Sequence, residues 1–99
     1  VAQQMESGVI FGLTAALHGR IDVVDGVVQQ RNFPDYDAIR LADMPRIDTV
    51  LLPSQAAPGG VGEPGTPPVA PAVANAWFAL SGERLRGLPL RPTQQVKTT

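Results

Sequence analysis

Hydrophobic residues recur at every third or fourth position over residues 1–18, and this spacing predicts a helix. The opposite side of this helix is also largely apolar, because Ile10, Phe11 and Ala15 lie there and Glu6 is its only carboxylate. A helix that is apolar nearly all round is expected to be buried on most sides. The positions of the repeat are Ala2, Met5, Val9, Leu13, Ala16 and Leu17.

Two glycines, Gly8 and Gly12, lie four residues apart inside this predicted helix. A glycine costs about 1 kcal/mol relative to alanine in a helix interior. The pair is therefore either a weak point of the helix or the place where another backbone comes close. Gly19 follows as the expected C-terminal cap.

Residues 21–30 predict a β-hairpin. Asp25 and Gly26 form the Asp-Gly pair that a two-residue type I′ turn prefers, since both central residues need a positive φ. β-branched residues flank the pair on both sides and favour strands. Residues 47–52 predict a further strand, and its last three residues do not alternate, so both of its faces are expected to be covered there.

The segment between these strands, residues 31–46, is predicted to be irregular. We interpret Phe33 and Tyr36 as packing anchors rather than ligand contacts. Residues 39–43 predict one helical turn, which Pro45 stops.

A second helix is predicted from Thr66, as its N-terminal cap, to Gly82, which ends it. Pro67 and Pro68 suit its first positions, where a missing N–H costs nothing. Its alanine content predicts close packing against the sheet or the first helix. Its apolar stripe consists of Val69, Val73, Trp77 and Leu80, widened by Ala70, Ala74 and Phe78, and the leucines expected to return to the core are Leu85, Leu88 and Leu90.

The predicted fold class is α+β, with two main helices packed on a small antiparallel or mixed sheet and a long Gly/Pro-rich loop. Residues 1–91 form the folded part of this prediction. Residues 92–99 are polar and predict a disordered tail.

Composition excludes several classes of function. Eight Lys and Arg against nine Asp and Glu leave no basic surface for nucleic acid. The chain has no Cys and one His, His18, so it has neither a thiolate site nor a self-contained zinc site. Charged residues make up 17% of its 99 residues, below the typical value of about 25%, which indicates that part of the surface faces other protein.

One carboxylate, Glu63, stands out in residues 59–68, because no other side chain between Asp48 and Glu83 ionises near neutral pH. Glycine, proline and small or apolar residues surround it. A lone carboxylate on such a loop suits a general base, and the helix start that follows offers N–H groups to an anion. The alternative is a flexible linker with one incidental Glu.

Two stretches, residues 64–67 and 68–71, match the PxxP spacing of polyproline ligands. A non-catalytic interaction module that binds a partner through this loop is therefore the competing hypothesis. It would depend on Pro64, Pro67, Pro68 and Pro71, whereas a catalytic role would depend on Glu63.

Three segments together resemble the large subunit of the molybdenum hydroxylases, the family that includes xanthine dehydrogenase and aldehyde oxidase. Residues 1–13 resemble its Gln-x-Glu-Gly helix, residues 32–36 and 43–45 its next segment, and residues 62–68 its Gly-Glu-Pro active-site loop. The resemblance covers nearly residues 1–90, in order and spacing, and is greatest to the bacterial branch that contains isoquinoline 1-oxidoreductase. Ser7 departs from the pattern, since relatives more often have Gly there.

The resemblance implies that residues 1–91 are a C-terminal fragment of a molybdopterin-binding domain. It implies a molybdenum–molybdopterin cytosine dinucleotide in the parent enzyme, with Gln4 and Gly62 near the cofactor. Glu63 then matches the general base in the hydroxylation of an N-heterocycle or an aldehyde, with water as the oxygen source. No metal ligand is expected in the chain itself.

The implied partners are the remainder of the large subunit and a small iron–sulfur subunit. The resemblance implies a bacterial protein, either cytoplasmic or exported already folded. Because most of the cofactor pocket would come from elsewhere, we expect this chain to be inactive alone, its loop over residues 53–66 to be mobile in isolation, and its apolar helix faces to favour self-association.

Overall fold

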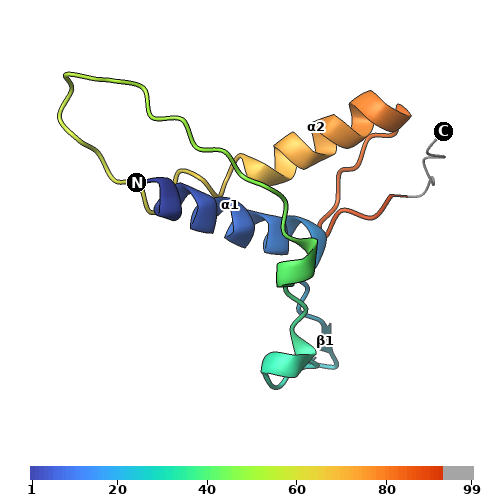
Figure 1. Cartoon of the computed structure of the whole chain (residues 1–99). Coiled ribbons are helices and arrows are strands. Elements are labelled where there is room, and N and C mark those ends of the chain that lie inside the picture. The colour runs from blue at the N-terminus through green and yellow to red at the C-terminus, as the bar shows by residue number, and fades with distance from the viewer. Residues whose placement is uncertain (93–99) are drawn as a thin grey trace.

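The computed structural model describes residues 1–92, in which two helices lie side by side and a hairpin projects from the end of the first (Figure 1). The elements are α1 (Ala2–Leu17), β1 (Val23–Val24), β2 (Val27–Val28), the 3₁₀ turns η1 (Phe33–Asp35) and η2 (Leu41–Asp43), and α2 (Val69–Ser81). Both predicted helices and the α+β class are confirmed. The disordered tail predicted for residues 92–99 falls, apart from Pro92, outside the described residues.

The glycines of α1 lie against the start of α2 and the turn before it. A Cβ built on Gly12 would lie 2.8 Å from the carbonyl oxygen of Thr66 and 2.8 Å from Cγ2 of Val69. One built on Gly8 would lie 3.3 Å from Cα of Gly65. The pair is therefore the place where another backbone comes close, as one of the two interpretations of the sequence predicted.

The core is small. Its buried apolar residues are Leu13, Ala16, Val69 and Leu90. Leu90 returns to α1 as expected, and its N–H donates to the carbonyl of Ala16 at 2.7 Å. Arg91 Nη1 donates to the carbonyl of Leu17 at 2.8 Å, so the residues that follow α2 satisfy two carbonyls of the last turn of α1.

The hairpin has the predicted turn. Val23 pairs with Val28 and Val24 with Val27, while Asp25 has φ 50° and Gly26 φ 77°. Within residues 1–92 the helices have no contacts with these strands, and the hairpin stands away from them in Figure 1. The prediction that the helices pack on the sheet was therefore wrong, because two-residue strands offer too little surface to cover.

The strand predicted over residues 47–52 is absent from the described structure. A strand needs a neighbour with which to exchange backbone hydrogen bonds, and this segment has none within residues 1–92. The sequence had predicted covered faces at its end, but Val50 and Leu52 are 79% and 84% exposed.

Four further side chains that were expected to pack are exposed: Phe33, Tyr36, Leu80 and Leu88. Phe33 is 93% exposed, so it is no packing anchor within residues 1–92. Tyr36 is 39% exposed, although its hydroxyl lies 2.6 Å from the position that a Cβ on Gly19 would take.

The helix ends differ from the prediction in two places. Pro68, not Thr66, is the N-cap residue of α2, and the Thr66 hydroxyl donates instead to the carbonyl of Gly8. At the end of α1 the C-cap is His18 rather than Gly19. Gly82 caps α2 in the left-handed conformation, with φ 75°, as predicted.

The C-terminal end of α2 is held by side chains. Trp77 Nε1 donates to Glu83 Oε2 at 3.0 Å, and the guanidinium of Arg84 lies 3.4 Å from the centroid of the Phe78 ring. Within residues 1–92 neither helix is long and apolar enough to cross a membrane.

The irregular segment is tied to the C-terminal part of α1 and to its C-cap residue by two hydrogen bonds. Ile39 N donates to Thr14 Oγ1 at 3.3 Å, and His18 Nδ1 donates to Asp37 Oδ2 at 2.9 Å. The hydrogen bond from His18 lowers the pKa of Asp37 below its ordinary value of 3.8.

We expect Gly12→Ala to destabilise the protein that contains this chain more than Gly8→Ala. Both changes gain about 1 kcal/mol of helix propensity. At Gly12 the new methyl meets a backbone carbonyl at 2.8 Å, whereas at Gly8 the nearest atom is at 3.3 Å. Overpacking costs about 1–3 kcal/mol, so only Gly12→Ala should be clearly unfavourable. Melting temperatures measured side by side test this, and equal values would contradict it.

We expect His18→Ala to raise the pKa of Asp37 toward 3.8. Because the folded-state pKa is the lower one, the stabilisation by this pair is complete above pH 3.8 and is lost as pH falls through the folded-state value. A carboxyl NMR titration measures it. Asp22 is the internal control, since Arg20 is the main cause of its lowered pKa. A shift of Asp22 instead of Asp37 would contradict the assignment.

Candidate functional site

Backbone hydrogen bonds and backbone packing hold the turn that carries Glu63, while the Glu63 side chain is exposed. Thr66 N donates to the carbonyl of Glu63 at 2.9 Å, and Val69 N donates to the carbonyl of Thr66 at 3.3 Å. Gly65, which is buried, lies against α1, where a Cβ on it would be 3.0 Å from the carbonyl oxygen of Met5. The carboxylate therefore projects into open space from a main chain that is hydrogen-bonded and packed against α1.

The other two predicted site residues lie at the same end of the molecule. Gln4 is exposed in the first turns of α1, four residues before Gly8 and on the same side of the helix. Gly65 packs against Gly8, so the turn that carries Glu63 lies on the N-terminal half of α1 (Figure 1). Gln4 belongs to that same half of the helix. Gly62 is exposed beside Glu63, and a Cβ on it would meet nothing within 4 Å.

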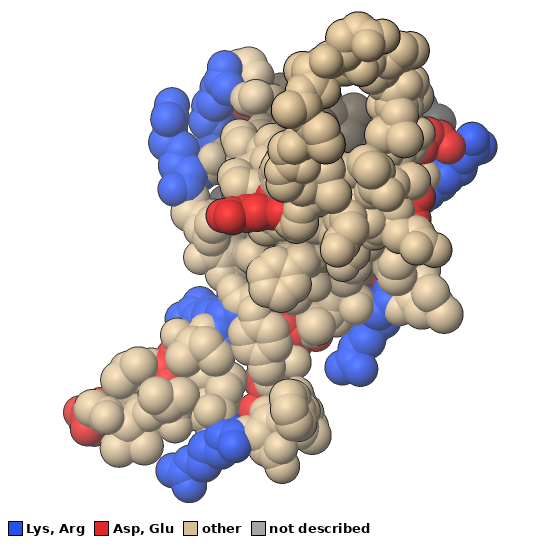
Figure 2. Space-filling view, turned by 90° about the vertical axis from the view of Figure 1, so that its left-hand side faces the viewer, with Lys and Arg blue, Asp and Glu red and all other residues tan. Residues whose placement is uncertain are grey.

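The surface around this turn carries little charge. Figure 2 views that end of the molecule, where uncharged residues form the centre and the loop above it, and Arg side chains lie toward the margins. No cationic side chain occurs in the sequence between Arg46 and Arg84. A proton-accepting carboxylate in this position is therefore not paired with a neighbouring cation from its own segment.

An apolar groove of about 550 Å³ lies directly beside the turn. Its walls come from α1, from α2, from residues 45–48 and from the turn itself through Pro64 and Gly65. The helix residues that line it are Met5, Val9, Leu13, Val69, Ala72 and Val73.

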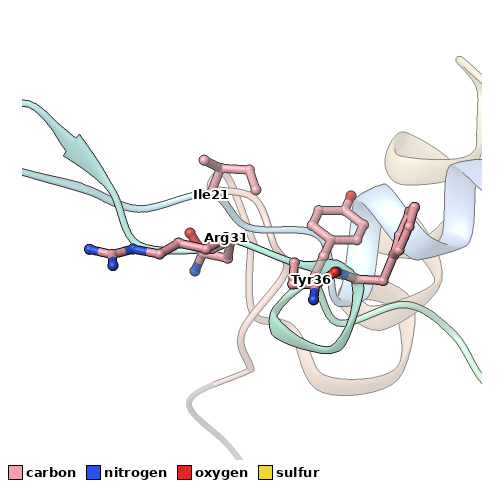
Figure 3. Close-up of a pocket in the computed structure, with 6 residues that line it drawn as sticks. Ile21, Arg31 and Tyr36 are labelled. Carbon is pink, nitrogen blue, oxygen red and sulfur yellow. The ribbon is translucent and has the colours of Figure 1, made fainter.

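A second pocket, of about 460 Å³, lies at the base of the hairpin and contains Ile21, Arg31 and Tyr36 (Figure 3). It is lined also by Gln30, Asn32 and Phe33. These residues include neither a carboxylate nor an imidazole that could serve as a general base near neutral pH. The Glu63 turn therefore remains the better candidate site.

Residues 1–92 contain no group of three or more His, Cys, Asp or Glu side chains that could hold a metal ion. The turn and the start of α1 offer an exposed carboxylate, an exposed primary amide and an unobstructed glycine backbone. This donor set fits one wall of a cofactor site. It does not enclose a cofactor.

Reasoning from the sequence missed the role of Thr66. Its hydroxyl donates to Gly8 O at 3.0 Å, across 58 residues of sequence. The glycine spacing in α1 was the available signal that another backbone docks there, but nothing local identified its partner.

The chain is similar to a part of several bacterial oxidoreductases, although no family model matches it. It is 42% identical over 92 residues to the beta subunit of isoquinoline 1-oxidoreductase from Brevundimonas diminuta, covering 93% of this chain and 12% of that protein. It is 40% identical over 94 residues, 95% of the chain, to a membrane-bound aldehyde dehydrogenase (pyrroloquinoline-quinone) of Gluconacetobacter polyoxogenes, of which it covers 12%.

A third relative is one of the subunits of nicotinate dehydrogenase from Pseudomonas putida, which is 32% identical over 91 residues, 91% of the chain and 8% of that protein. The chain thus spans about an eighth or less of the length of the relatives it matches. In each case the match extends over almost all of the chain.

Proposed function

We propose that the chain belongs to the molybdenum hydroxylase family that its motifs resemble, and that it supplies the general base, Glu63, of an oxidoreductase. The reaction we propose is hydroxylation of an N-heterocycle or an aldehyde, with water as the source of oxygen. The observation that carries this proposal is the exposed Glu63 carboxylate on a turn whose backbone is fixed to α1.

A general base must be accessible and still held in position. It has to come within about 3 Å of the proton that it accepts. The carbonyl of Glu63 is hydrogen-bonded and Gly65 is packed on α1, so the main chain of this turn is held against α1 while the Glu63 side chain stays accessible. In a site closed by the rest of the protein, the apolar surroundings would keep water away from this carboxylate.

Gln4 and Gly62 are the proposed cofactor contacts. The Gln4 amide can donate and accept hydrogen bonds, and the open backbone at Gly62 allows a bulky group to approach. When bound, the molybdenum–molybdopterin cytosine dinucleotide would supply the redox centre of the reaction. Iron–sulfur clusters on a separate small subunit would carry the electrons away.

The remainder of the large subunit is the other proposed partner. Residues 1–91 would then be the C-terminal part of its molybdopterin-binding domain. Two observations support this placement. The chain matches only a small part of each relative, and its candidate site offers only one wall for a cofactor, with no metal-binding cluster of its own within residues 1–92. Alone, the 99-residue chain should be inactive.

The name of one relative gives pyrroloquinoline quinone as its cofactor, which makes a quinone the competing proposal for this chain. The two cofactors are distinguished directly by assaying the purified full-length protein for molybdenum and for bound quinone. Molybdenum without quinone would support the first proposal, and the reverse result would overturn it.

The interaction-module hypothesis is less well supported by the geometry. Pro71 lies in the first turn of α2 and Pro68 is its N-cap, so the stretch over residues 68–71 is helical. A polyproline ligand requires an extended left-handed helix, which this stretch does not have.

We expect Glu63→Gln in the full-length protein, assembled with its small subunit, to lower turnover by at least about 10²-fold, because a positioned general base contributes roughly 10²–10⁴-fold. Molybdenum content should stay unchanged, because the substitution conserves size. Turnover on an N-heterocycle and on an aromatic aldehyde provides the measurement.

The matched control is Glu83→Gln at the end of α2, where the new amide keeps an oxygen that can accept from the Trp77 indole. This variant should behave as the unmodified protein does. Wild-type turnover in Glu63→Gln would end the catalytic proposal and leave the turn as structure or partner surface.

A further inference from the structure

We propose that Thr66 is a positioning residue for Glu63, acting through the hydrogen bond that its hydroxyl donates to the carbonyl of Gly8. The inference rests on the proposed role of Glu63. It adds a specific residue, and a specific atom of that residue, on which the placement of the base depends.

The Thr66 side chain joins two parts of the chain that are 58 residues apart, with Oγ1 3.0 Å from the Gly8 carbonyl oxygen. In an α-helix this carbonyl also accepts from the N–H of Gly12. A carbonyl oxygen has two lone pairs, so it can take both donors without disrupting the helix. The hydroxyl therefore adds a bond to α1 rather than replacing one.

The fit of Thr66 against α1 depends on glycine. A Cβ on Gly8 would lie 3.4 Å from Thr66 Oγ1, and one on Gly12 would lie 2.8 Å from the Thr66 carbonyl oxygen. Thr66 thus lies over the Gly8–Gly12 face and is half-buried there. Its position is set by close contact as well as by the hydrogen bond.

The same residue holds the main chain of Glu63. Its N–H donates to the Glu63 carbonyl at 2.9 Å, and its own carbonyl accepts from the N–H of Val69 at 3.3 Å. One residue is thereby bonded to the turn, to α1 and to the start of α2. A shift of Thr66 relative to α1 must move Glu63 relative to Gln4.

The size of the effect follows from how sharply catalysis depends on geometry. A misplacement of about 1 Å can cost around 10²-fold in rate. Thr66→Val keeps the shape of the side chain and removes the donor. We expect it to lower kcat by roughly 10–10²-fold, with KM and molybdenum content unchanged.

The test uses the full-length protein with its small subunit and compares Thr66→Val, Thr66→Ser and Glu63→Gln. Thr66→Ser retains the hydroxyl and should restore kcat to near the wild-type value. Amide hydrogen exchange over residues 60–68 gives a readout independent of turnover. It should rise in Thr66→Val and stay at the wild-type level in Thr66→Ser.

The matched control is Thr14→Val, which removes a hydroxyl of α1 that accepts from Ile39 N, away from the Glu63 turn. It should leave both kcat and exchange over residues 60–68 unchanged. If Thr66→Val also loses molybdenum, retention of metal and turnover in Thr66→Ser still assigns the effect to the hydroxyl.

The inference is overturned if Thr66→Val exchanges like the wild type over residues 60–68, or if Thr66→Ser is as defective as Thr66→Val. Its failure is distinct from failure of the proposed function. A wild-type rate in Glu63→Gln refutes the catalytic role of Glu63, whereas a slow Glu63→Gln together with a normal Thr66→Val refutes only the positioning role of Thr66.

Discussion

The close approach of residues 65–66 to the Gly8–Gly12 face of α1 is the contact on which the rest of the structure depends. It is made between backbones, with a Cβ position on Gly12 only 2.8 Å from the Thr66 carbonyl oxygen, so no larger residue can replace the glycine without a shift. It sets where α2 begins, because Val69 is buried against the same face. It also decides where the Glu63 carboxylate projects and where the apolar groove beside it lies.

Few side chains reinforce this contact. The buried apolar residues of the described part of the chain are four, whereas Phe11, Val50 and Leu52 are all more than 70% exposed. Exposed apolar surface on this scale is typical of a region that other protein covers, and the low charge content agrees with that interpretation. The proposed place of the chain inside a larger subunit accounts for both features, since each of its relatives is many times longer than the matched region.

Features encoded locally could be predicted from the sequence. Both helices, the turn at Asp25 and Gly26, and the cap at Gly82 depend on periodicity or on a positive φ within a few residues, and all are present. Features that need a distant partner could not be predicted in the same way. The strand expected over residues 47–52 has no neighbouring strand, and Phe33 has nothing to pack against, within residues 1–92.

Thr66 shows most clearly why the candidate site was only partly predictable. A threonine just before a proline-started helix is typical of an N-cap, and the local pattern offered no reason to expect anything else. The glycines of α1 indicated a close approach without saying of what. Only the three-dimensional structure connects these two signals, because it places the Thr66 hydroxyl over the Gly8 carbonyl. A candidate general base could thus be proposed from the sequence alone, but the contact that holds its turn could not, because that contact belongs equally to two distant segments.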